Sequence, residues 1–530
     1  MVALRFYLEW IYRRLDLIAL VLILVVLAVL SLLPLRLLVT CFVIDDALYY
    51  PKIAANISSG LGTTYDGFTR TNGAHPLWQI LWVPLAALAN QNTDLLLRFG
   101  FVLSAAVTGG AFFLVFLLLR RLSIHPFGIA ISMMAMFIVR VDLWMSLMES
   151  ALTFLLLTAV LYFAIRQLQD GNLRLISSVI YGALVAGLFL ARLDTVILAP
   201  VLMLTTAYVW TVSWKLAARH FFVSSVTVLV IVTPYVIWNL VSFGHLVPVS
   251  GSAKMSEWSF SRIDDGLLVL PRSALAKLPG SESTWQFIFV AGFVIVLAGV
   301  IYRRESWIRF VRGHQDLSIL IGAYVVAVSL RQLYLVTVLA DEIVPWYLVP
   351  EMVLIMFGIA LGFNALKPNI RDGMLVHGIM IIGILAFSVA GTAYLVNDAS
   401  NTRTANSVTF ETALWAKENL PEGSRLAMYD SGYVSYISGK DTLSVNGLAT
   451  DFVTMEALSS GGALEVFEQF DIDYLVQIMP ASVLGSLPGE SVLFQSNAFP
   501  AGHTYSGQLI FVMDLDQPGT VQALLELGYP

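Results

Sequence analysis

Charged residues are scarce in this chain, and cysteine and nucleotide-binding motifs are almost or wholly missing. Lys, Arg, Asp and Glu make up 12% of the 530 residues, about half of the ~25% found in soluble domains. The single cysteine, Cys41, excludes an intrachain disulfide. The sequence contains no Walker motif and no glycine-rich dinucleotide fingerprint. Together with a hydrophobic content of 58%, these absences exclude a soluble enzyme, a disordered protein and a disulfide-stapled secreted domain.

Long apolar runs fill the first three quarters of the chain. Runs long enough to cross the roughly 30 Å hydrocarbon core of a bilayer predict a polytopic α-helical membrane protein with about eleven spans. The spans are expected near 15–40, 95–119, 123–140, 150–166, 175–191, 194–212, 221–241, 285–302, 316–339, 343–363 and 374–396. With the N-terminus in the cytoplasm, half of the 30 Lys and Arg residues fall in short inner segments, as the positive-inside rule requires. We therefore expect a plasma-membrane protein with an extracytoplasmic tail.

The tail differs from the rest of the chain in charge and in pattern. From residue 396 onward 16 acidic and 4 basic residues give a net charge of −12, whereas the preceding part has 20 acidic and 26 basic residues. Short β-rich segments alternate with helical ones and predict a compact α/β domain of about 130 residues. The expected strands are 425–429, 442–445, 474–478 and 509–515, and the expected helices are 407–420, 454–470 and 520–527. We divide the chain into a transmembrane domain, 1–396, and an extracytoplasmic α/β domain, 397–530.

Two further outer segments, 41–94 and 242–284, are too long to be simple turns. In the first, Tyr49, Tyr50 and Ile53 share one face of a predicted helix over 47–59, which is typical of a helix lying in the membrane interface. The stretch 76–90 is apolar but only fifteen residues long, so we expect a second interfacial or re-entrant helix there.

Asp45 and Asp46 are the first candidates for chemistry, because they follow the first span directly. One of them is expected to cap the helix that follows, which leaves the other for a different role. Adjacent carboxylates repel, so the pKa of one should rise unless a cation lies nearby, and such a carboxylate suits a general base. Adjacency to the helix favours Asp46 as the cap and Asp45 as the base, although either order fits. With Asp66 and His75 the pair could also complete a divalent-cation site, but the spacing is that of no strong metal motif.

Arg331 lies within a predicted span, where a guanidinium is costly unless it is paired. Two interpretations remain open: an ion pair to Glu149 or Glu351, or a clamp for a phosphate. Other polar and aromatic residues are expected near the outer ends of spans: His75, Arg98, Arg140, Asp142, Glu149, Arg192, Asp194, Lys254, Asp341, Glu342, Trp346 and Tyr347. Taken one at a time, the charged residues could extend to the interface or pair locally, and the aromatic residues could belong to an interfacial belt. Taken together, these residues indicate a polar cavity that opens outward.

Several short motifs resemble the GT-C glycosyltransferases, polytopic enzymes that use polyprenyl-phosphate sugars, and in particular their bacterial, archaeal and arabinofuranosyltransferase-like members. The resemblance is carried by 45–50, 52–54, 71–78, 148–150, 191–194, 234–254, 429–439 and 445–448. It is most specific in the first outer segment, with Asp45-Asp46-Ala47-Leu48-Tyr49-Tyr50 and Thr71-Asn72-Gly73-Ala74-His75-Pro76-Leu77-Trp78. Where the family would have Arg-Pro-Asp, this chain has Arg192-Leu193-Asp194.

The resemblance implies an inverting glycosyltransferase that transfers a sugar from a polyprenyl-phosphate donor to a glycan, lipid or protein acceptor on the outer face of the membrane. Asp45 or Asp46 would be the base, with Arg331, Arg192 and Lys254 at the donor phosphate. His75, Glu149, Asp194, Trp346 and Tyr347 would line the acceptor and sugar cavity. A secondary transporter or a non-catalytic scaffold of an envelope complex remain the alternatives. The acidic tail argues against nucleic acid as a partner, and the identity of the sugar and of the acceptor cannot be read from the sequence.

Overall fold

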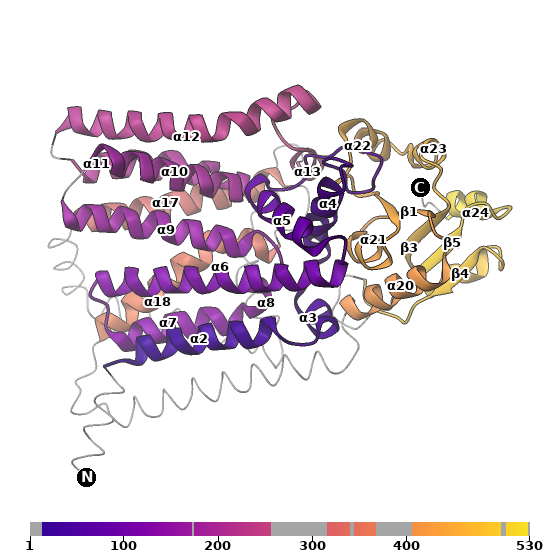
Figure 1. Cartoon of the computed structure of the whole chain (residues 1–530), viewed down its shortest axis with the longest axis horizontal. Helices are drawn as coiled ribbons and strands as arrows, with labels where there is room; N and C mark the ends of the chain where they lie inside the picture. Colours follow the sequence, from indigo (N-terminus) through magenta and orange to yellow (C-terminus); the bar gives the residue numbers. More distant parts are fainter. Residues whose placement is uncertain are drawn as a thin grey trace, which may run out of the picture.

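The computed structural model describes residues 13–171, 174–211, 213–255, 315–339, 344–366, 405–499 and 505–527. The spans predicted at 285–302 and 374–396, most of the segment 242–284, and Asp341 and Glu342 lie outside the described residues. The described residues form a helical bundle, 13–366, and a sheet domain, 405–527, which docks against one end of the bundle (Figure 1).

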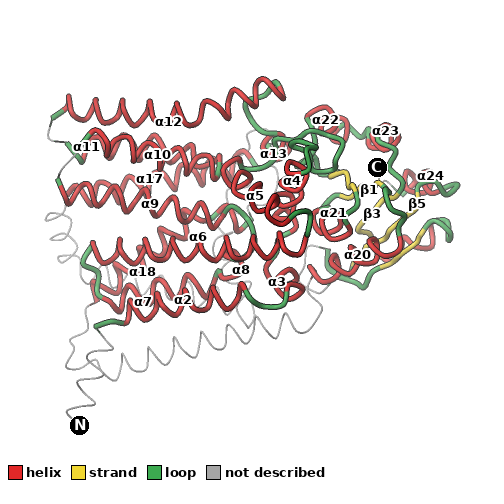
Figure 2. Tube along the Cα trace, in the orientation of Figure 1, coloured by secondary structure: helices red, strands yellow, loops and turns green. Residues whose placement is uncertain are grey.

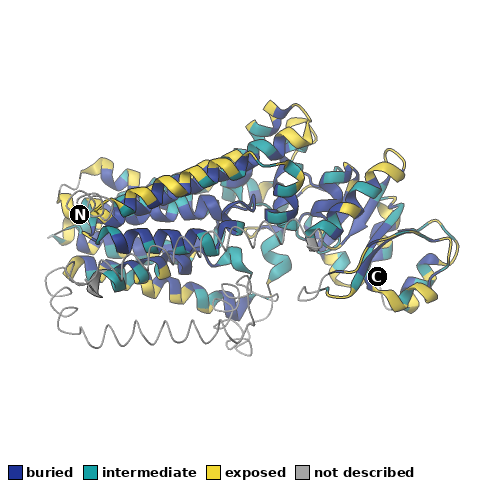
Figure 3. Cartoon of the chain, turned by 90° about the horizontal axis from the view of Figure 1, so that it is seen from below, coloured by how far each residue is buried: buried dark blue, intermediate teal, exposed yellow. Residues whose placement is uncertain are grey.

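Most helices of the bundle run side by side along its long axis (Figure 1). They are α2 (Leu15–Ser31), α6 (Thr93–Arg121), α7 (Pro126–Val139), α9 (Ser150–Asp170), α10 (Leu175–Ala191), α11 (Leu198–Val209), α12 (Trp214–Phe243), α17 (Gln315–Val338) and α18 (Val349–Leu366). Short helices α8 (Val141–Trp144), η2 (Leu193–Ile197), α13 (Val249–Lys254) and η3 (Pro345–Tyr347) lie among the connections. Many residues along the helices of the bundle are buried, and Figure 3 shows them in dark blue.

Four described helices, α6, α9, α12 and α17, are long and apolar enough to cross a membrane. The pair α2 and α3 (Leu35–Phe42), which is bent by 115°, would make a fifth crossing. The spans expected near 123–140, 175–191, 194–212 and 343–363 appear as shorter apolar helices of 10 to 17 residues. A polytopic helical membrane region is therefore confirmed, and the number eleven stays a prediction.

The first long connection, 41–94, folds into three helices at the end of the bundle that faces the sheet domain (Figure 1). They are η1 (Asp45–Leu48), α4 (Tyr49–Ser58) and α5 (Pro76–Ala89). The helix predicted at 47–59 corresponds to α4, whose buried residues include Tyr49, Tyr50 and Ile53. The short apolar stretch at 76–90 is α5, which begins at Pro76 because the fixed φ of proline and its missing N–H suit the first position of a helix.

The sheet domain contains a five-stranded sheet in the order β2-β1-β3-β5-β4, and Figure 2 shows the described strands gathered there. The strands are β1 (Arg425–Met428), β2 (Asp441–Ser444), β3 (Tyr474–Pro480), β4 (Val492–Gln495) and β5 (Gln508–Asp514). β1 is parallel to β2 and β3, whereas β5 is antiparallel to β3 and β4. The accompanying helices are α20 (Ala405–Asn419), α21 (Gly432–Ser438), α22 (Phe452–Ser459), α23 (Ala463–Gln469), η4 (Ala481–Ser486) and α24 (Thr520–Glu526).

The mixed α/β character and the four expected strands are confirmed, with two differences in detail. The helix predicted at 454–470 is broken into α22 and α23, because Gly461 adopts φ +86° between them. The edge strand β4, whose four residues alternate between half-buried and exposed, was not predicted.

Candidate functional site

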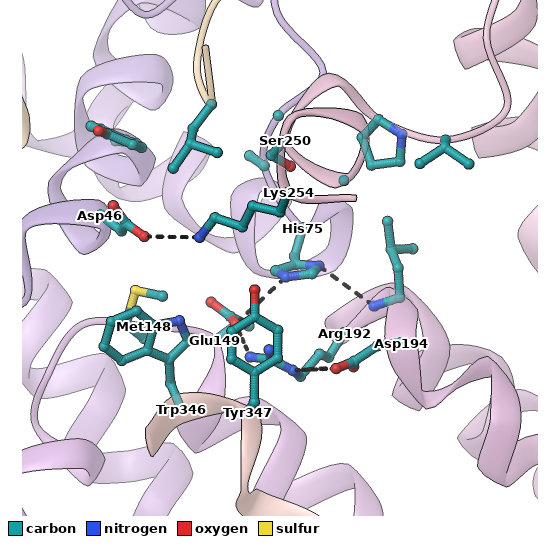
Figure 4. A pocket seen from close by; sticks show the side chains of 18 of the residues that line it. Asp46, His75, Met148, Glu149, Arg192, Asp194, Ser250, Lys254, Trp346 and Tyr347 are labelled. Atoms are coloured by element: carbon teal, nitrogen blue, oxygen red, sulfur yellow. Dashed lines mark hydrogen bonds and ion pairs between the residues drawn. The ribbon is translucent and has the colours of Figure 1, made fainter. Parts of the chain in front are cut away.

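A cavity of about 360 Å³ lies at the end of the bundle beneath the sheet domain (Figure 4). Its polar wall comes from η1, from the turns before α5 and α9, from η2, and from α13 and η3. Its apolar wall comes from α10, α12 and α17, and Leu448 and Ala449 of the sheet domain complete the lining. The residues of the predicted polar cavity that line it are Asp46, His75, Glu149, Arg192, Asp194, Lys254, Trp346 and Tyr347.

Asp45 and Asp46 point to different places, because consecutive residues of a 3₁₀ helix are about 120° apart around its axis. Asp46 lines the cavity, where its Oδ2 lies 3.6 Å from Nζ of Lys254 (Figure 4). Asp45 turns toward the sheet domain, and its carboxylate accepts hydrogen bonds from the backbone N–H groups of Gly432 and Tyr433, each at 2.9 Å. The doublet therefore separates into one carboxylate in the cavity and one at the domain contact.

The expectation that one of these aspartates caps the following helix needs correction. Neither η1 nor α4 has a side-chain cap in the structure. Asp45 instead accepts from the first N–H groups of α21, a helix nearly 400 residues away in the chain. A helix N-terminus attracts a carboxylate because its N–H groups are unsatisfied and carry partial positive charge. Burial and the charge of Asp430 raise the pKa of Asp45 to about 8, while the two N–H groups oppose this rise.

Glycine at position 432 allows this close contact. A Cβ atom there would lie 2.0 Å from the backbone oxygen of Asp45. A second contact of the same kind joins Gly73 of the first long connection to Leu448, whose backbone oxygen would lie 2.0 Å from a Cβ at position 73. A hydrogen bond between the hydroxyls of Tyr65 and Ser431, and one from Thr450 to Thr69, support the same interface. The sheet domain and the first long connection therefore form one joint structure above the cavity.

A chain of buried charges of alternating sign forms the floor of the cavity. Arg192 donates from Nη1 to Oε1 of Glu149 at 2.5 Å and from Nε to Oδ1 of Asp194 at 3.1 Å. Arg331 donates from Nη2 to Oδ2 of Asp194 at 2.7 Å and from Nη1 to Oε1 of Glu351 at 3.1 Å. Both arginine side chains are almost fully buried. Each guanidinium is shared by two carboxylates, which fixes its plane in the low-dielectric interior.

Arg331 lies behind the cavity wall and is not among its lining residues. Besides its two carboxylate partners, it donates to the backbone oxygen of Tyr347 at 2.6 Å. The ion pair to Glu351, one of the two interpretations of the sequence, is thus present in the structure. Arg192 does line the cavity, and its guanidinium lies over the ring of Tyr347 at 4.2 Å.

His75 lies between the floor of the cavity and α5. Its Nε2 is 3.6 Å from Oε1 of Glu149, and its Nδ1 accepts a long hydrogen bond from the N–H of Leu193 at 3.5 Å (Figure 4). Burial lowers the pKa of His75, so the ring is neutral at pH 7. Tyr50 donates to the other oxygen of Glu149 at 2.8 Å. Glu149 is therefore a shared acceptor of Arg192 and Tyr50, with His75 beside it.

The remaining expected residues lie away from the cavity. Arg98 donates to the backbone oxygens of Ser31 and Leu33, and Arg140 pairs with Asp142 at 3.5 Å. The divalent-cation site considered for Asp45, Asp46, Asp66 and His75 is not assembled, and no group of three His, Cys, Asp or Glu suited to a metal occurs within the described ranges. Asp66 instead holds its own turn together, accepting from Thr64, Phe68 and Thr69.

Asp430 lies near the cavity, and the sequence predicted no role for it. It is the second residue after β1, and its carboxyl group accepts a hydrogen bond from the hydroxyl of Tyr505 at 2.9 Å. Burial and the charge of Asp46 raise the pKa of Asp430, whereas the nearby Lys254 opposes this rise. The sheet domain thus contributes a third carboxylate to the surroundings of the Asp46–Lys254 pair. The only sequence feature that could have identified Asp430 was its place in 429–439, one of the stretches that carry the resemblance to the GT-C family.

The bundle, the helical connection at its end and the docked sheet domain together have an architecture similar to that of crystal structures of ArnT, so the fold predicted from the resemblance is confirmed. The chain is similar to the crystal structure of ArnT from Cupriavidus metallidurans bound to undecaprenyl phosphate, with a TM-score of 0.58 and 14% identity over 94% of this chain and 98% of that chain. Apo ArnT from the same organism gives a TM-score of 0.57 and 12% identity over 93% and 97% of the two chains. An apo oligosaccharyltransferase from Archaeoglobus fulgidus gives a TM-score of 0.50 and 12% identity over 90% and 71%.

The similarity in sequence is much weaker than the similarity in fold. A family of domains of unknown function, DUF8728, matches residues 397–516, which cover most of the sheet domain. No curated protein matches the chain. The comparisons therefore establish the architecture of the chain, and a reaction has to be inferred from the residues that line the cavity.

Proposed function

We propose that this protein is an inverting glycosyltransferase that takes a sugar from a polyprenyl-phosphate donor and transfers it to a hydroxyl of a glycan, lipid or protein acceptor. The observation that carries the proposal is the Asp46–Lys254 pair at 3.6 Å within a cavity that also has an apolar wall. A carboxylate to accept a proton and an ammonium to bind a phosphate are what this transfer needs. Similarity to an ArnT structure that contains undecaprenyl phosphate supports the same donor class.

Asp46 is the proposed base, in place of the Asp45 favoured by sequence adjacency. Asp46 faces the cavity, whereas the Asp45 carboxylate is engaged by two N–H groups of α21. In the proposed step Asp46 takes the proton of the acceptor hydroxyl, and the acceptor oxygen bonds to the anomeric carbon from the face opposite the phosphate. The bond between that carbon and the phosphate oxygen breaks, and polyprenyl phosphate leaves with one more negative charge.

Lys254 is the proposed partner of the departing phosphate. While Asp46 is ionised, it attracts the ammonium; once Asp46 holds the acceptor proton, that attraction is lost. The negative charge on the phosphate rises in the same step, so Lys254 is drawn toward the leaving group at the moment when stabilisation is needed. Arg192 also lines the cavity, but Glu149 and Asp194 already offset its charge. We therefore assign Lys254 the larger share of the phosphate binding.

Arg331 is proposed to act indirectly. Because it is buried between Asp194 and Glu351, it holds Asp194 in place, and Asp194 in turn fixes the guanidinium of Arg192. His75, Trp346 and Tyr347 line the cavity and are proposed to contact the transferred sugar. This assignment revises the direct phosphate contact expected of Arg331 from the sequence.

The apolar wall is the proposed seat of the first isoprene units of the donor. It is formed by Phe189 and Val196 beside α10, Tyr235 and Val236 of α12, and Tyr334, Leu335 and Leu339 at the end of α17. With the N-terminus in the cytoplasm, as the basic inner segments predict, this end of the bundle faces outward. The donor would then enter from the outer leaflet of the plasma membrane, and transfer would take place outside the cytoplasm.

The test uses the full chain in nanodiscs with a panel of radiolabelled undecaprenyl-phosphate monosaccharides and membrane glycans as acceptors. Asp46→Asn should lower transfer by about 100-fold or more, the range of general-base contributions. Asp94→Asn is the matched control, because Asp94 is an exposed acid of the same long connection outside the cavity. Full activity of Asp46→Asn would refute the proposed base. Uptake of sugar into liposomes that contain the protein, without transfer, would favour a transporter, and glycan binding without turnover would favour a scaffold.

A further inference from the structure

A second, smaller crevice of about 210 Å³ lies in the sheet domain and is not used by the proposed reaction. It is lined by 428–430 at the end of β1, by 476–478 of β3, and by Tyr505. Its volume is below the roughly 300–1,000 Å³ of pockets for drug-sized ligands. The space therefore suits a single small ring better than a nucleotide.

The place of the crevice in the sheet is where α/β domains bind ligands. From β1 the chain passes through α21 to β2 on one side, and from β2 it returns through α22 and α23 to β3 on the other side of β1. From β3 the chain continues through η4 to β4, away from β1, so the connections that leave β1 and β3 diverge. The crevice lies where β1 ends beside the middle of the parallel strand β3. Ligands of open α/β sheets bind at such a switch point.

In this domain the side chain of Asp45 already occupies the place where such domains bind an anion. In many domains of this kind the N-terminus of the helix after the first strand binds a phosphate. Here the N–H groups of Gly432 and Tyr433 bind the carboxylate of Asp45. The crevice beside it keeps a carboxylate, Asp430, in its wall. A second anion would meet repulsion from these acidic groups, so the ligand of the crevice is not an anion.

The side chains that remain offer one apolar face and several hydrogen-bonding groups. Tyr429 is about half exposed and presents an aromatic ring. Gln477 of β3 supplies an amide with both donors and an acceptor, and the Asp430 carboxylate accepts hydrogen bonds. An aromatic ring beside an amide and a carboxylate matches a sugar, which has an apolar C–H face and a rim of hydroxyls.

The crevice and the cavity share a wall. Asp430, in the crevice, is hydrogen-bonded to Asn446, and Asn446 donates to the hydroxyl of Tyr49 at 3.3 Å. Tyr49 lines the cavity. A ligand ring in the crevice is thus separated from the Asp46–Lys254 pair by one layer of side chains.

We propose that the crevice between the end of β1 and the middle of β3 binds a sugar ring of the acceptor saccharide, while another part of the same saccharide presents its hydroxyl to Asp46. This inference rests on the proposed function, because it presumes a saccharide acceptor. It makes Tyr429 and Gln477 residues that select the acceptor and take no part in the chemical step.

The experiment measures saturation-transfer difference NMR on the full chain in nanodiscs with four probes: the methyl glycosides of glucopyranose, galactopyranose, mannopyranose and arabinofuranose. At least one probe should give a signal, and Tyr429→Ala and Gln477→Ala should each weaken its binding about tenfold, the loss expected for one or two good contacts. Gln495→Ala is the matched control for Gln477→Ala, since Gln495 is an exposed glutamine on the edge strand β4.

The outcomes separate this inference from the proposed function. Asp46→Asn should abolish transfer and leave the NMR signal unchanged. If no probe binds, or if the crevice variants bind as the unmodified chain does, the sugar site is refuted. If transfer occurs but Tyr429→Ala and Gln477→Ala leave the KM of the acceptor unchanged, the site is refuted while the glycosyltransferase stands. A signal that depends on both residues in a chain without any transfer would establish the sugar site and refute the enzyme.

Discussion

Replacing Gly432 by alanine tests whether the sheet domain docks on the first long connection as described. The added Cβ would lie 2.0 Å from the backbone oxygen of Asp45, whereas real Cβ contacts essentially never fall below 3.0 Å. The two backbones must therefore separate by about 1 Å. Gly432 has no positive φ, so alanine strains nothing within α21 itself and gains up to about 1 kcal/mol of helix propensity.

The cost falls on the hydrogen bonds that cross the interface. A shift of this size stretches both contacts of the Asp45 carboxylate, which are 2.9 Å long. A buried hydrogen-bonding group that loses its partner costs about 1–3 kcal/mol. Even with the gain in helix propensity, docking should weaken by about 2 kcal/mol or more, which raises the undocked population roughly 30-fold.

Hydrogen exchange read by mass spectrometry measures this effect directly. Peptides that contain η1 and the start of α21 should lose protection together in Gly432→Ala, while α6 and α9 in the bundle keep theirs. Gly485→Ala is the control, because a Cβ at that position meets open space. If the η1 and α21 peptides of Gly432→Ala exchange as slowly as those of the control, the docking geometry described above is wrong.

Three further predictions follow from the buried charges. Arg331→Met leaves the carboxylates of Asp194 and Glu351 without their shared partner and should destabilise the chain by about 3–5 kcal/mol, measured as a lower midpoint of thermal unfolding; an unchanged midpoint would contradict the described pairing. Lys254→Met should lower kcat for transfer by about 100- to 1,000-fold, because it removes one electrostatic contact to the charge that develops on the phosphate. Lys254→Arg keeps the positive charge and should retain part of the rate. Equal losses in both variants would argue against a role for the charge. The pKa of Asp45 is raised from 3.8 to about 8, so between these values the folded chain holds a proton that the unfolded chain releases. The temperature midpoint of unfolding should therefore fall as the pH rises from 5 to 8, and Asp45→Asn should flatten this dependence. A midpoint that rises with pH would contradict the predicted direction.

Much of the fold could be predicted because its elements carry local signals. Apolar runs predict helices such as α6 and α12, and the alternation of β-rich and helical segments predicted the strands β1, β2, β3 and β5 of the sheet domain. The break between α22 and α23 was missed because Gly461-Gly462 sits in an otherwise helical pattern, where glycine is often tolerated. The number of crossings could not be checked by helix length alone, because several apolar helices, such as α7, have fewer than 18 residues.

The residue types of the site could be predicted from the sequence, but the contacts between these residues could not. Charged residues in apolar surroundings, such as Glu149 and Arg192, could be recognised as candidates for the site, because a buried charge requires a partner. Which carboxylate faces the cavity depends on a 3₁₀ turn at Asp45 and on a helix N-terminus supplied by Gly432, far away in the chain. Long-range contacts of this kind leave no periodic pattern in a single sequence. The role of Asp430 was missed for the same reason.

The contact between Asp45 and α21 also bears on how the protein is made. Residues of the first connection emerge early in synthesis, whereas Gly432 and Tyr433 come almost 400 residues later. At elongation rates of ~5–20 residues per second, the interval lasts tens of seconds. During that time the Asp45 carboxyl group lacks its two N–H partners in α21, and the cavity lacks the part of its lining that Leu448 and Ala449 supply. The cavity is therefore complete only after the sheet domain has been synthesised and has docked on the first long connection.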